Sequence, residues 1–307
     1  MTLTPRQLAV LVVLTLIWGI NWPILKVGVT GFPPLTFRAL SMWLGLPVLG
    51  AAVLLLKVPL AIPRAHWREL SSLTLGNMIV WHVLAILSIQ ALSSGRAAIL
   101  GYTMPVFSAL CGAAMYGERL APRQLAGVAA ASLGVALLLW HEFAQFSGRP
   151  LGALGMLVAA AVWAFGTQQF RRTRMTVPTL AIAFWMTVLT TLVMTVLAVA
   201  FEHERWKGPT PAVWGAIVFN AIGVFGYAQP AWLMLARALP PVASTLSVML
   251  IPVLGVASGA LWLDETLHWQ DGAAVVLMVV AIASVLWPQR RTAAPAQPQP
   301  GGASQPP

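Results

Sequence analysis

Trp18, Asn21 and Trp22 stand inside a long apolar run of this 307-residue sequence. They are spaced i, i+3 and i+4, so a helix would carry them on one face. An amide between two indoles offers a hydrogen-bond donor and acceptor beside large apolar surfaces, which suits a solute with polar and apolar parts. We interpret this face as the wall of a solute-binding cavity. The alternative is that Asn21 bonds to a neighbouring helix and Trp22 lies at the end of its run.

Further aromatic residues recur inside apolar runs at a fixed separation. His82 and Tyr227 are 145 positions apart, as are Trp18 and Trp163, and Tyr102 lies between them in another run. Polar-tipped rings deep in apolar segments need hydrogen-bond partners or water. We therefore predict that these residues also line the cavity. The alternative for His82 is a bond to a carbonyl group of a neighbouring helix.

Pro105 and Pro252 stand in the middle of two further apolar runs, 147 positions apart. Each proline removes a backbone donor and leaves a carbonyl group without its helical partner. Matched interruptions of this kind predict a hinge or a binding surface. The alternative, a static kink in each helix, stays open.

Groups needed for catalysis or metal binding are scarce. The acidic residues nearest the centres of the runs, Glu118, Asp264 and Glu265, stand at run ends, and Cys111 is the single cysteine. The histidines are scattered, and neither an HExxH nor a GxSxG motif is present. The sequence therefore predicts no catalytic residues, no metal site and no cofactor.

The elements that carry these residues are long and apolar. Hydrophobic residues make up 59% of the chain and charged residues 8%, where a soluble domain carries about 25% charged residues. Ten runs have about the length that a helix needs to cross a membrane. They lie at 8–26, 35–56, 70–89, 95–116, 124–140, 151–170, 179–200, 212–235, 242–263 and 272–287. We predict an all-α integral membrane protein with ten transmembrane helices.

Lysine and arginine residues are distributed unequally between the two sides of such a protein. Twelve fall on the side of both termini and five on the other, with Arg38 inside the second run. The positive-inside rule therefore places both termini in the cytoplasm. The net charge of +10 reflects this bias and predicts no nucleic-acid partner, because the basic residues are dispersed over short loops.

An internal repeat relates the two halves of the chain. A shift of 147 places MPVFSALCGAAMYGERL over IPVLGVASGALWLDETL, and so aligns Glu118 with Glu265. Each half contains five runs, so the second half enters the membrane from the opposite side. Inverted repeats of this kind are typical of secondary transporters. We predict two inverted five-helix repeats, at 1–145 and 146–291, and a disordered cytoplasmic tail at 292–307 that is rich in proline, alanine and glutamine.

The WGxN pattern around Trp18, Arg38 and the two P…G…E-x-L segments resemble the EamA family of the drug/metabolite transporter superfamily. The resemblance covers about residues 5–288 and is greatest to the YddG-type exporters of aromatic and other amino acids. It implies a ten-helix fold of inverted repeats with both termini inside. The second half departs from the pattern, because Gly166 occupies the position equivalent to Asn21.

These features favour export of amino acids across the bacterial plasma membrane, the cell inner membrane. No carboxylate is predicted at mid-membrane to exchange protons, so we expect facilitated movement with His82 as the one titratable group there. Lys26 or Arg38 would assist in binding a carboxylate, although both stand toward the outer ends of their runs, where snorkelling is the usual explanation. The alternatives are an exporter of other metabolites or drugs, an intramembrane enzyme, or a scaffold. The sequence leaves the oligomeric state open.

Overall fold

A computed structural model describes residues 4–144, 150–238 and 241–286, and these residues form helices without a β-strand. The α-helices are α1 (Pro5–Val29), α2 (Pro34–Leu55), α3 (Trp67–Thr74), α4 (Val80–Ala91), α5 (Ser94–Gly101), α6 (Met104–Tyr116), α7 (Pro122–Ala144), α8 (Pro150–Arg171), α9 (Thr179–Glu202), α10 (Pro211–Phe219), α11 (Gln229–Ala238), α12 (Pro241–Leu263) and α13 (Trp269–Leu286). Two π-helical segments, η2 (Leu75–Ile79) and η4 (Asn220–Ala228), join α3 to α4 and α10 to α11. A short 3-10 turn precedes α3 at Arg64–His66, and another follows α9 at His203–Arg205.

Seven helical stretches among the described residues are long and apolar enough to cross a membrane. Three shorter apolar helices accompany them, at Pro122–Leu138, Leu250–Leu263 and Trp269–Ser284. The prediction of an all-helical membrane protein is confirmed. The predicted tail, residues 292–307, and the junction between the predicted halves lie outside the described residues.

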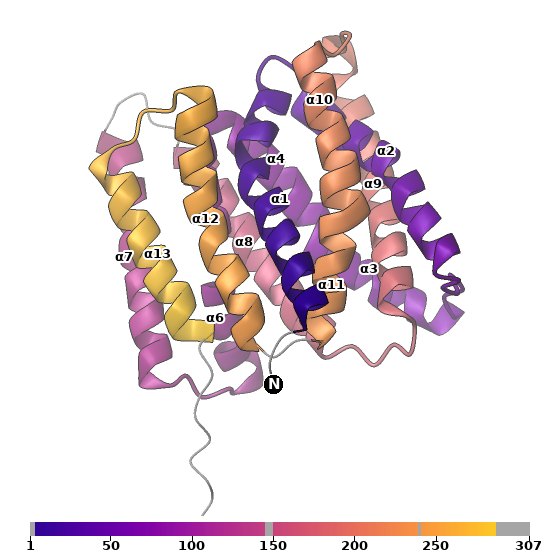
Figure 1. The fold of residues 1–307 in the computed structure, drawn as a ribbon, viewed down its shortest axis with the longest axis horizontal. Coiled ribbons are helices and arrows are strands. Elements are labelled where there is room, and N and C mark those ends of the chain that lie inside the picture. The colour runs from indigo at the N-terminus through magenta and orange to yellow at the C-terminus, as the bar shows by residue number, and fades with distance from the viewer. Residues whose placement is uncertain (1–3, 145–149, 239–240, 287–307) are drawn as a thin grey trace, which may run out of the picture.

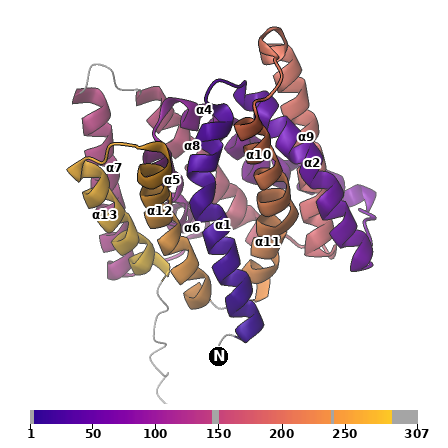
Figure 2. The ribbon, with the colours of Figure 1, turned by 45° about the horizontal axis from the view of Figure 1, so that its top comes forward.

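The helices run side by side in one bundle (Figure 1). Helix α1 lies in front, packed against α12 on one side and against α10 and η4 on the other. Helices α7 and α13 pack together at one edge, and α2 and α9 at the opposite edge, as both views show (Figure 2). The start of α1 and the end of α13 lie at the same end of the bundle, which we call the terminal end.

Two helices end with the same local geometry, 147 positions apart. Gly117 after α6 has φ +64°, and Asp264 after α12 has φ +51°. The next residue in each case, Glu118 or Glu265, donates its backbone N–H back to a glycine carbonyl, at 3.2 Å for Gly112 and 3.5 Å for Gly259. These bonds satisfy carbonyl groups that a helix end leaves unpaired. The aligned segments therefore turn the chain in the same way.

The two π-helical segments also occupy equivalent positions, because Leu75 and Asn220 begin them 145 residues apart. A π turn widens the helix and occurs often at functional sites. Close packing surrounds η2, where a Cβ on Gly166 would lie 2.7 Å from the Asn77 amide nitrogen. Gly166 therefore lets α8 approach this segment, which gives a packing reason for a residue without a side chain there.

The prolines differ from the expected matched interruptions. Helix α5 ends at Gly101, and α6 restarts at Met104, so Pro105 lies in the first turn of a new helix, where its missing N–H costs nothing. Pro252 lies inside α12, which continues from Pro241 to Leu263. Only the first of the two apolar runs is thus broken into two helices.

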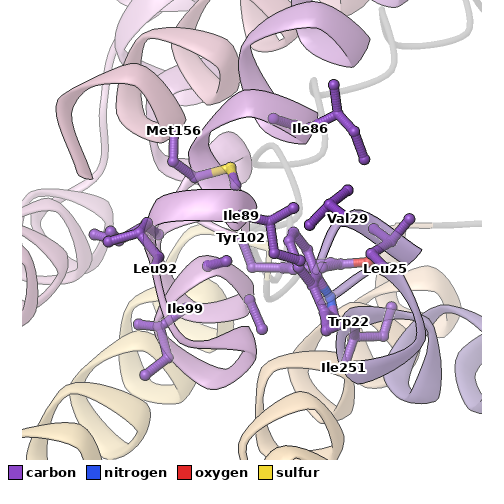
Figure 3. Packing of buried hydrophobic residues seen from close by; sticks show 14 of the residues in the cluster. Trp22, Leu25, Val29, Ile86, Ile89, Leu92, Ile99, Tyr102, Met156 and Ile251 are labelled. Carbon is purple, nitrogen blue, oxygen red and sulfur yellow. The ribbon is translucent and has the colours of Figure 1, made fainter. Parts of the chain in front are cut away.

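The main core lies where α1, α4, α5, α8 and α12 meet. Figure 3 shows Trp22 and Tyr102 side by side at its centre, surrounded by aliphatic side chains. Glycines make the room for the indole, since a Cβ on Gly101 would lie 2.8 Å from Trp22 and one on Gly255 would lie 3.2 Å from it. The bulk of Trp22 therefore determines how closely α5 and α12 approach α1.

Candidate functional site

The α1 residues predicted to share one wall have different neighbours. Trp18 is half-buried and lies with its ring centroid 5.6 Å from that of Trp232 in α11. Trp22 is buried and packs edge-on against Tyr102, with centroids 6.3 Å apart (Figure 3). Asn21 is 8% exposed, and its amide oxygen has no hydrogen-bond partner among the described residues. A buried unpaired acceptor is costly, so this oxygen marks a position for a donor from a solute or water.

His82 lies in the middle of the stretch formed by α3, η2 and α4. It is 5% exposed, and neither ring nitrogen has a hydrogen-bond partner among the described residues. The structure therefore does not show the alternative, a hydrogen bond from His82 to a carbonyl group of a neighbouring helix. Its ring lies edge-on to Phe225 of η4, with centroids 5.5 Å apart. The imidazole thus keeps both a donor and an acceptor available at the centre of the bundle.

The remaining predicted residues are dispersed. Tyr227 of η4 is half-buried and packs against a small cluster near the start of α1, whereas Phe225, two residues earlier, contacts His82. Trp163 is half-buried on α8. The structure therefore gathers Trp22 with Tyr102 and His82 with Phe225, and it places Tyr227 and Trp18 against the same small cluster.

Lys26 was expected to snorkel or to assist in binding a carboxylate, and the structure corrects both expectations. Its ammonium group donates to the carbonyl oxygens of Ile89, Gln90 and Leu92, at 3.1, 3.1 and 2.6 Å. An ammonium group has three donors, so these contacts use all of them. The carbonyl groups belong to the C-terminal end of α4, where a cation is also favoured by the helix dipole. Lys26 is a helix cap.

Arg38 was also expected to snorkel, but its side chain is buried and most of its donors have no partner among the described residues. It lies in the second turn of α2 and is 3% exposed, so it does not snorkel to the membrane surface. Its Nη1 donates one long hydrogen bond, 3.4 Å, to the amide oxygen of Asn220, and its Nε has no partner. The guanidinium carbon lies 5.6 Å from the centroid of the Phe225 ring. Sequence reasoning named Arg38 but missed its contact with Asn220, because nothing in the spacing of the two residues indicates that they meet.

Acidic side chains hold helix ends at the end of the bundle opposite the terminal end. Glu202 accepts from the backbone N–H groups of Leu35 and Thr36 at the start of α2, at 3.1 and 2.8 Å. Glu265 accepts from both the N–H and the hydroxyl of Ser94 at the start of α5, at 2.7 and 2.9 Å, and from the N–H of Gly95 at 3.3 Å. Glu265 is therefore a partly buried cap of α5.

Glu118 at the terminal end is more exposed than Glu265. It pairs with Arg172, and the side chains of the two residues are 52% and 34% exposed. Arg172 also bonds to Gln168, whose amide nitrogen donates to Ser108. Among the described residues no group of three or more His, Cys, Asp or Glu side chains is placed to hold a metal ion. Asn21 and His82 thus offer hydrogen-bonding groups, and Arg38 offers a cation, in an apolar interior.

The chain matches the EamA-like transporter family over residues 6–140 and again over 150–287. It belongs to the EamA-like transporter family. Among its relatives, the aromatic amino acid exporter YddG of Ancylobacter novellus is 30% identical over 75% of this chain and 83% of its own length. The inner membrane transporter YedA of Escherichia coli K12 is 28% identical over 92% of both chains.

A solved crystal structure has the same fold. It superposes with a TM-score of 0.66 over 91% of this EamA-like chain and 97% of its own, at 22% identity. The family assignment makes the protein a multi-pass membrane transporter. The unpaired polar atoms at its centre, on Asn21, Arg38 and His82, are therefore candidates for contact with the transported solute.

Proposed function

We propose that this EamA-like transporter exports amino acids, aromatic and other neutral ones with broad specificity, from the cytoplasm by alternating access. The observation that carries the proposal is the pair of buried polar side chains, Asn21 and His82, whose amide oxygen and ring nitrogens have no described partner. An ammonium group needs acceptors, and a carboxylate needs donors. The rings of Trp18 and Trp22 on the helix of Asn21, and the ring of Phe225 in η4 beside His82, offer apolar surface to a side chain. The Ancylobacter relative is named as an aromatic amino acid exporter, which supports this proposal.

The same proposal includes ten membrane spans in two inverted five-helix repeats, at 1–145 and 146–291. Seven long and three shorter apolar helices support it, as do the two separate family matches. The packing is also reciprocal, because α1 packs on α12 as α8 packs on α5 and α6, and α2 packs on η4 as α9 packs on η2. These pairs exchange when the halves are interchanged, which a two-fold relation requires.

Both termini lie in the cytoplasm in this proposal, and the membrane is the bacterial inner membrane. The common position of the start of α1 and the end of α13 supports a shared side, and the excess of basic residues there supports the cytoplasm. Single cysteines on a Cys111→Ala background provide the test. An impermeant thiol reagent should label Gly208→Cys from outside and spare Arg64→Cys and Arg174→Cys. The opposite labelling pattern would reverse the orientation.

Transport is facilitated in this proposal, so a neutral amino acid moves down its own gradient. Proton coupling needs a group that changes its protonation between access states, and among the described residues His82 is the one histidine buried at the centre of a span. The described carboxylates lie at helix ends, where Glu202 and Glu265 cap other helices. A carrier with this composition is not expected to concentrate its substrate against a gradient.

The experiment is counterflow in liposomes that contain the purified protein. Vesicles loaded with unlabelled phenylalanine should take up labelled phenylalanine, leucine and tryptophan at the same rate with and without an imposed pH gradient. Empty liposomes and liposomes with heat-denatured protein are the controls. If no amino acid exchanges while an organic cation does, the protein is a drug exporter and the proposal fails.

A further inference from the structure

Arg38 is a buried cation in the second turn of α2, and no anion among the described residues pairs with it. We propose that Arg38, together with Asn220 and His82, forms a subsite for a carboxylate, so that the transporter accepts solutes with a free carboxylate and rejects their amides and amines. The inference rests on the proposed function, since it names the group by which that substrate is recognised. It does not depend on which side chain the substrate carries.

The guanidinium group has more donors than the protein satisfies. It carries five N–H groups, yet the described residues supply one acceptor, the Asn220 oxygen at 3.4 Å, and leave Nε unpaired. No described carboxylate lies within 4 Å of it, whereas Arg96 bonds to Asp271 at 2.8 Å and Arg172 pairs with Glu118. Arginine inside a membrane otherwise pairs, because an isolated charge there is costly. Arg38 thus lacks an anion that its environment requires.

Rigid packing holds the group in position. Helix α2 approaches η4 so closely that a Cβ on Gly45 would lie 2.7 Å from the Cβ of Phe225 and 3.0 Å from the carbonyl oxygen of Ala221. Phe225 is 1% exposed, and the guanidinium carbon of Arg38 lies over the Phe225 ring, 5.6 Å from the ring centroid. Asn220 is fixed as well, since its amide nitrogen donates to the carbonyl oxygen of Ala216 at 3.0 Å. The subsite is therefore preorganised rather than assembled on binding.

His82 provides the second side of the subsite. Its ring centroid lies 5.5 Å from that of Phe225, so the imidazole and the guanidinium share one phenyl ring as neighbour. A neutral imidazole donates through one nitrogen and accepts through the other. A carboxylate has two oxygens that accept several hydrogen bonds, and the planar fork of arginine matches it in geometry. Phosphate-sized groups would need more cations than Arg38, the one buried arginine among the side chains that the structure describes.

The consequence is a selection rule for substrates. A solute with a free carboxylate supplies the missing anion, whether or not it has an ammonium group. An amide of the same shape leaves the guanidinium unpaired, and an amine adds a second positive charge beside it. Phenylalanine and 3-phenylpropionate should therefore compete for the site, whereas phenylalaninamide should not. One charge-assisted hydrogen-bonded contact accounts for about a tenfold to hundredfold difference in affinity.

The test measures inhibition of labelled leucine counterflow by phenylalanine, 3-phenylpropionate and phenylalaninamide in proteoliposomes. The wild type should bind both acids at least about tenfold more tightly than the amide. Arg38→Gln should weaken both acids about tenfold to hundredfold and leave the amide unchanged, and Arg38→Lys should restore part of the loss. Lys26→Met, which removes an outer-side cation whose donors are already used, should leave the ratio of acid to amide unchanged.

Asn220→Asp keeps the proposal testable if Arg38→Gln does not fold. The new carboxylate has the same shape and lies against Arg38, so it should lower the affinity for both acids as an internal competitor. Thermal stability is not the readout, because the variant loses the donor that bonds to the carbonyl oxygen of Ala216. If Arg38 is purely structural, a folded Asn220→Asp variant keeps the wild-type affinity for both acids, and that result overturns the subsite. Equal affinity of the wild type for phenylalanine and phenylalaninamide also overturns it. Absence of counterflow with every amino acid refutes the proposed function instead.

Discussion

Replacing Lys26 with methionine tests whether this cation stabilises a helix or binds a substrate. Methionine retains the length and apolar character of the stem and removes the ammonium group, which leaves three carbonyl oxygens at the C-terminal end of α4 without their donor. Hydrogen bonds that involve a charged group contribute about 1.5–3 kcal/mol each. The three bonds share one ammonium group at a half-buried position, so they do not add, and we expect a total loss of about 3 kcal/mol.

The assay is thermal unfolding of the purified protein in detergent, run in parallel with counterflow of phenylalanine. A loss of about 3 kcal/mol corresponds to a decrease in Tm of about 6–12 °C on the scale of domains with 150–250 residues. The KM for phenylalanine should change less than about twofold. Lys26→Arg, which keeps the charge near the same carbonyl groups, should retain most of the stability. If Lys26→Met unfolds like the wild type and its KM rises about tenfold, Lys26 contacts the substrate and the reasoning from its three bonds is wrong.

Three further variants address the aromatic rings, the imidazole and the prolines. Trp18→Ala or Trp163→Ala should raise the KM for tryptophan about tenfold and leave that for alanine unchanged, because a buried ring contact contributes about 1–3 kcal/mol; normal kinetics in both folded variants would assign the rings to packing. His82→Gln should transport amino acids at a rate independent of a pH gradient. If the wild type accumulates substrate, and both an uncoupler and His82→Gln abolish that accumulation, the imidazole is a proton site. Pro105→Ala should lower turnover more than Pro252→Ala, since the helix is broken at the first; unchanged turnover in both would leave them as static features.

The helices could be predicted from the sequence because their signals are local. Runs of apolar residues locate the stretches within a few residues, and the proline at the start of α1, α2, α7, α8, α10 and α12 stands where a helix accepts it. The equivalent turns after α6 and α12 follow from the aligned P…G…E-x-L segments. The residues at the centre could also be named in part, since Asn21 and His82 are polar side chains in apolar runs.

The rest depends on contacts between segments far apart in the chain. Arg38 and Asn220 are 182 positions apart, so no local pattern indicates that one faces the other. Lys26 could be assigned to a cap only once the end of α4 was known to lie beside it. The π-helical segments have no apolar periodicity that distinguishes them from α-helix, and Pro105 and Pro252 look alike until one helix is seen to restart and the other to continue. Position in the sequence did not separate Phe225 from Tyr227, because helix rotation decides which ring meets His82.

The carboxylates at the two ends of the bundle make those ends unequal mechanically. Glu265 joins the second half to the start of α5 through three short-range bonds from a partly buried site, whereas Glu118 joins the first half to Arg172 across an exposed ion pair. Parting the first contact leaves backbone donors unpaired. Parting the second breaks an exposed ion pair of about 0–1 kcal/mol and the stacking of Arg172 on Tyr116, which contributes about 0.5–1 kcal/mol at an exposed site. With the proposed orientation, the Glu118–Arg172 contact is the cytoplasmic gate and the Glu265–Ser94 contact the outer gate, and the cytoplasmic gate is the weaker of the two. We expect the empty carrier to rest open toward the cytoplasm, and added salt to loosen that gate further without affecting the outer one. Accessibility of a cysteine at the Glu118 end, followed against ionic strength, measures this bias, and equal response at both ends would contradict it.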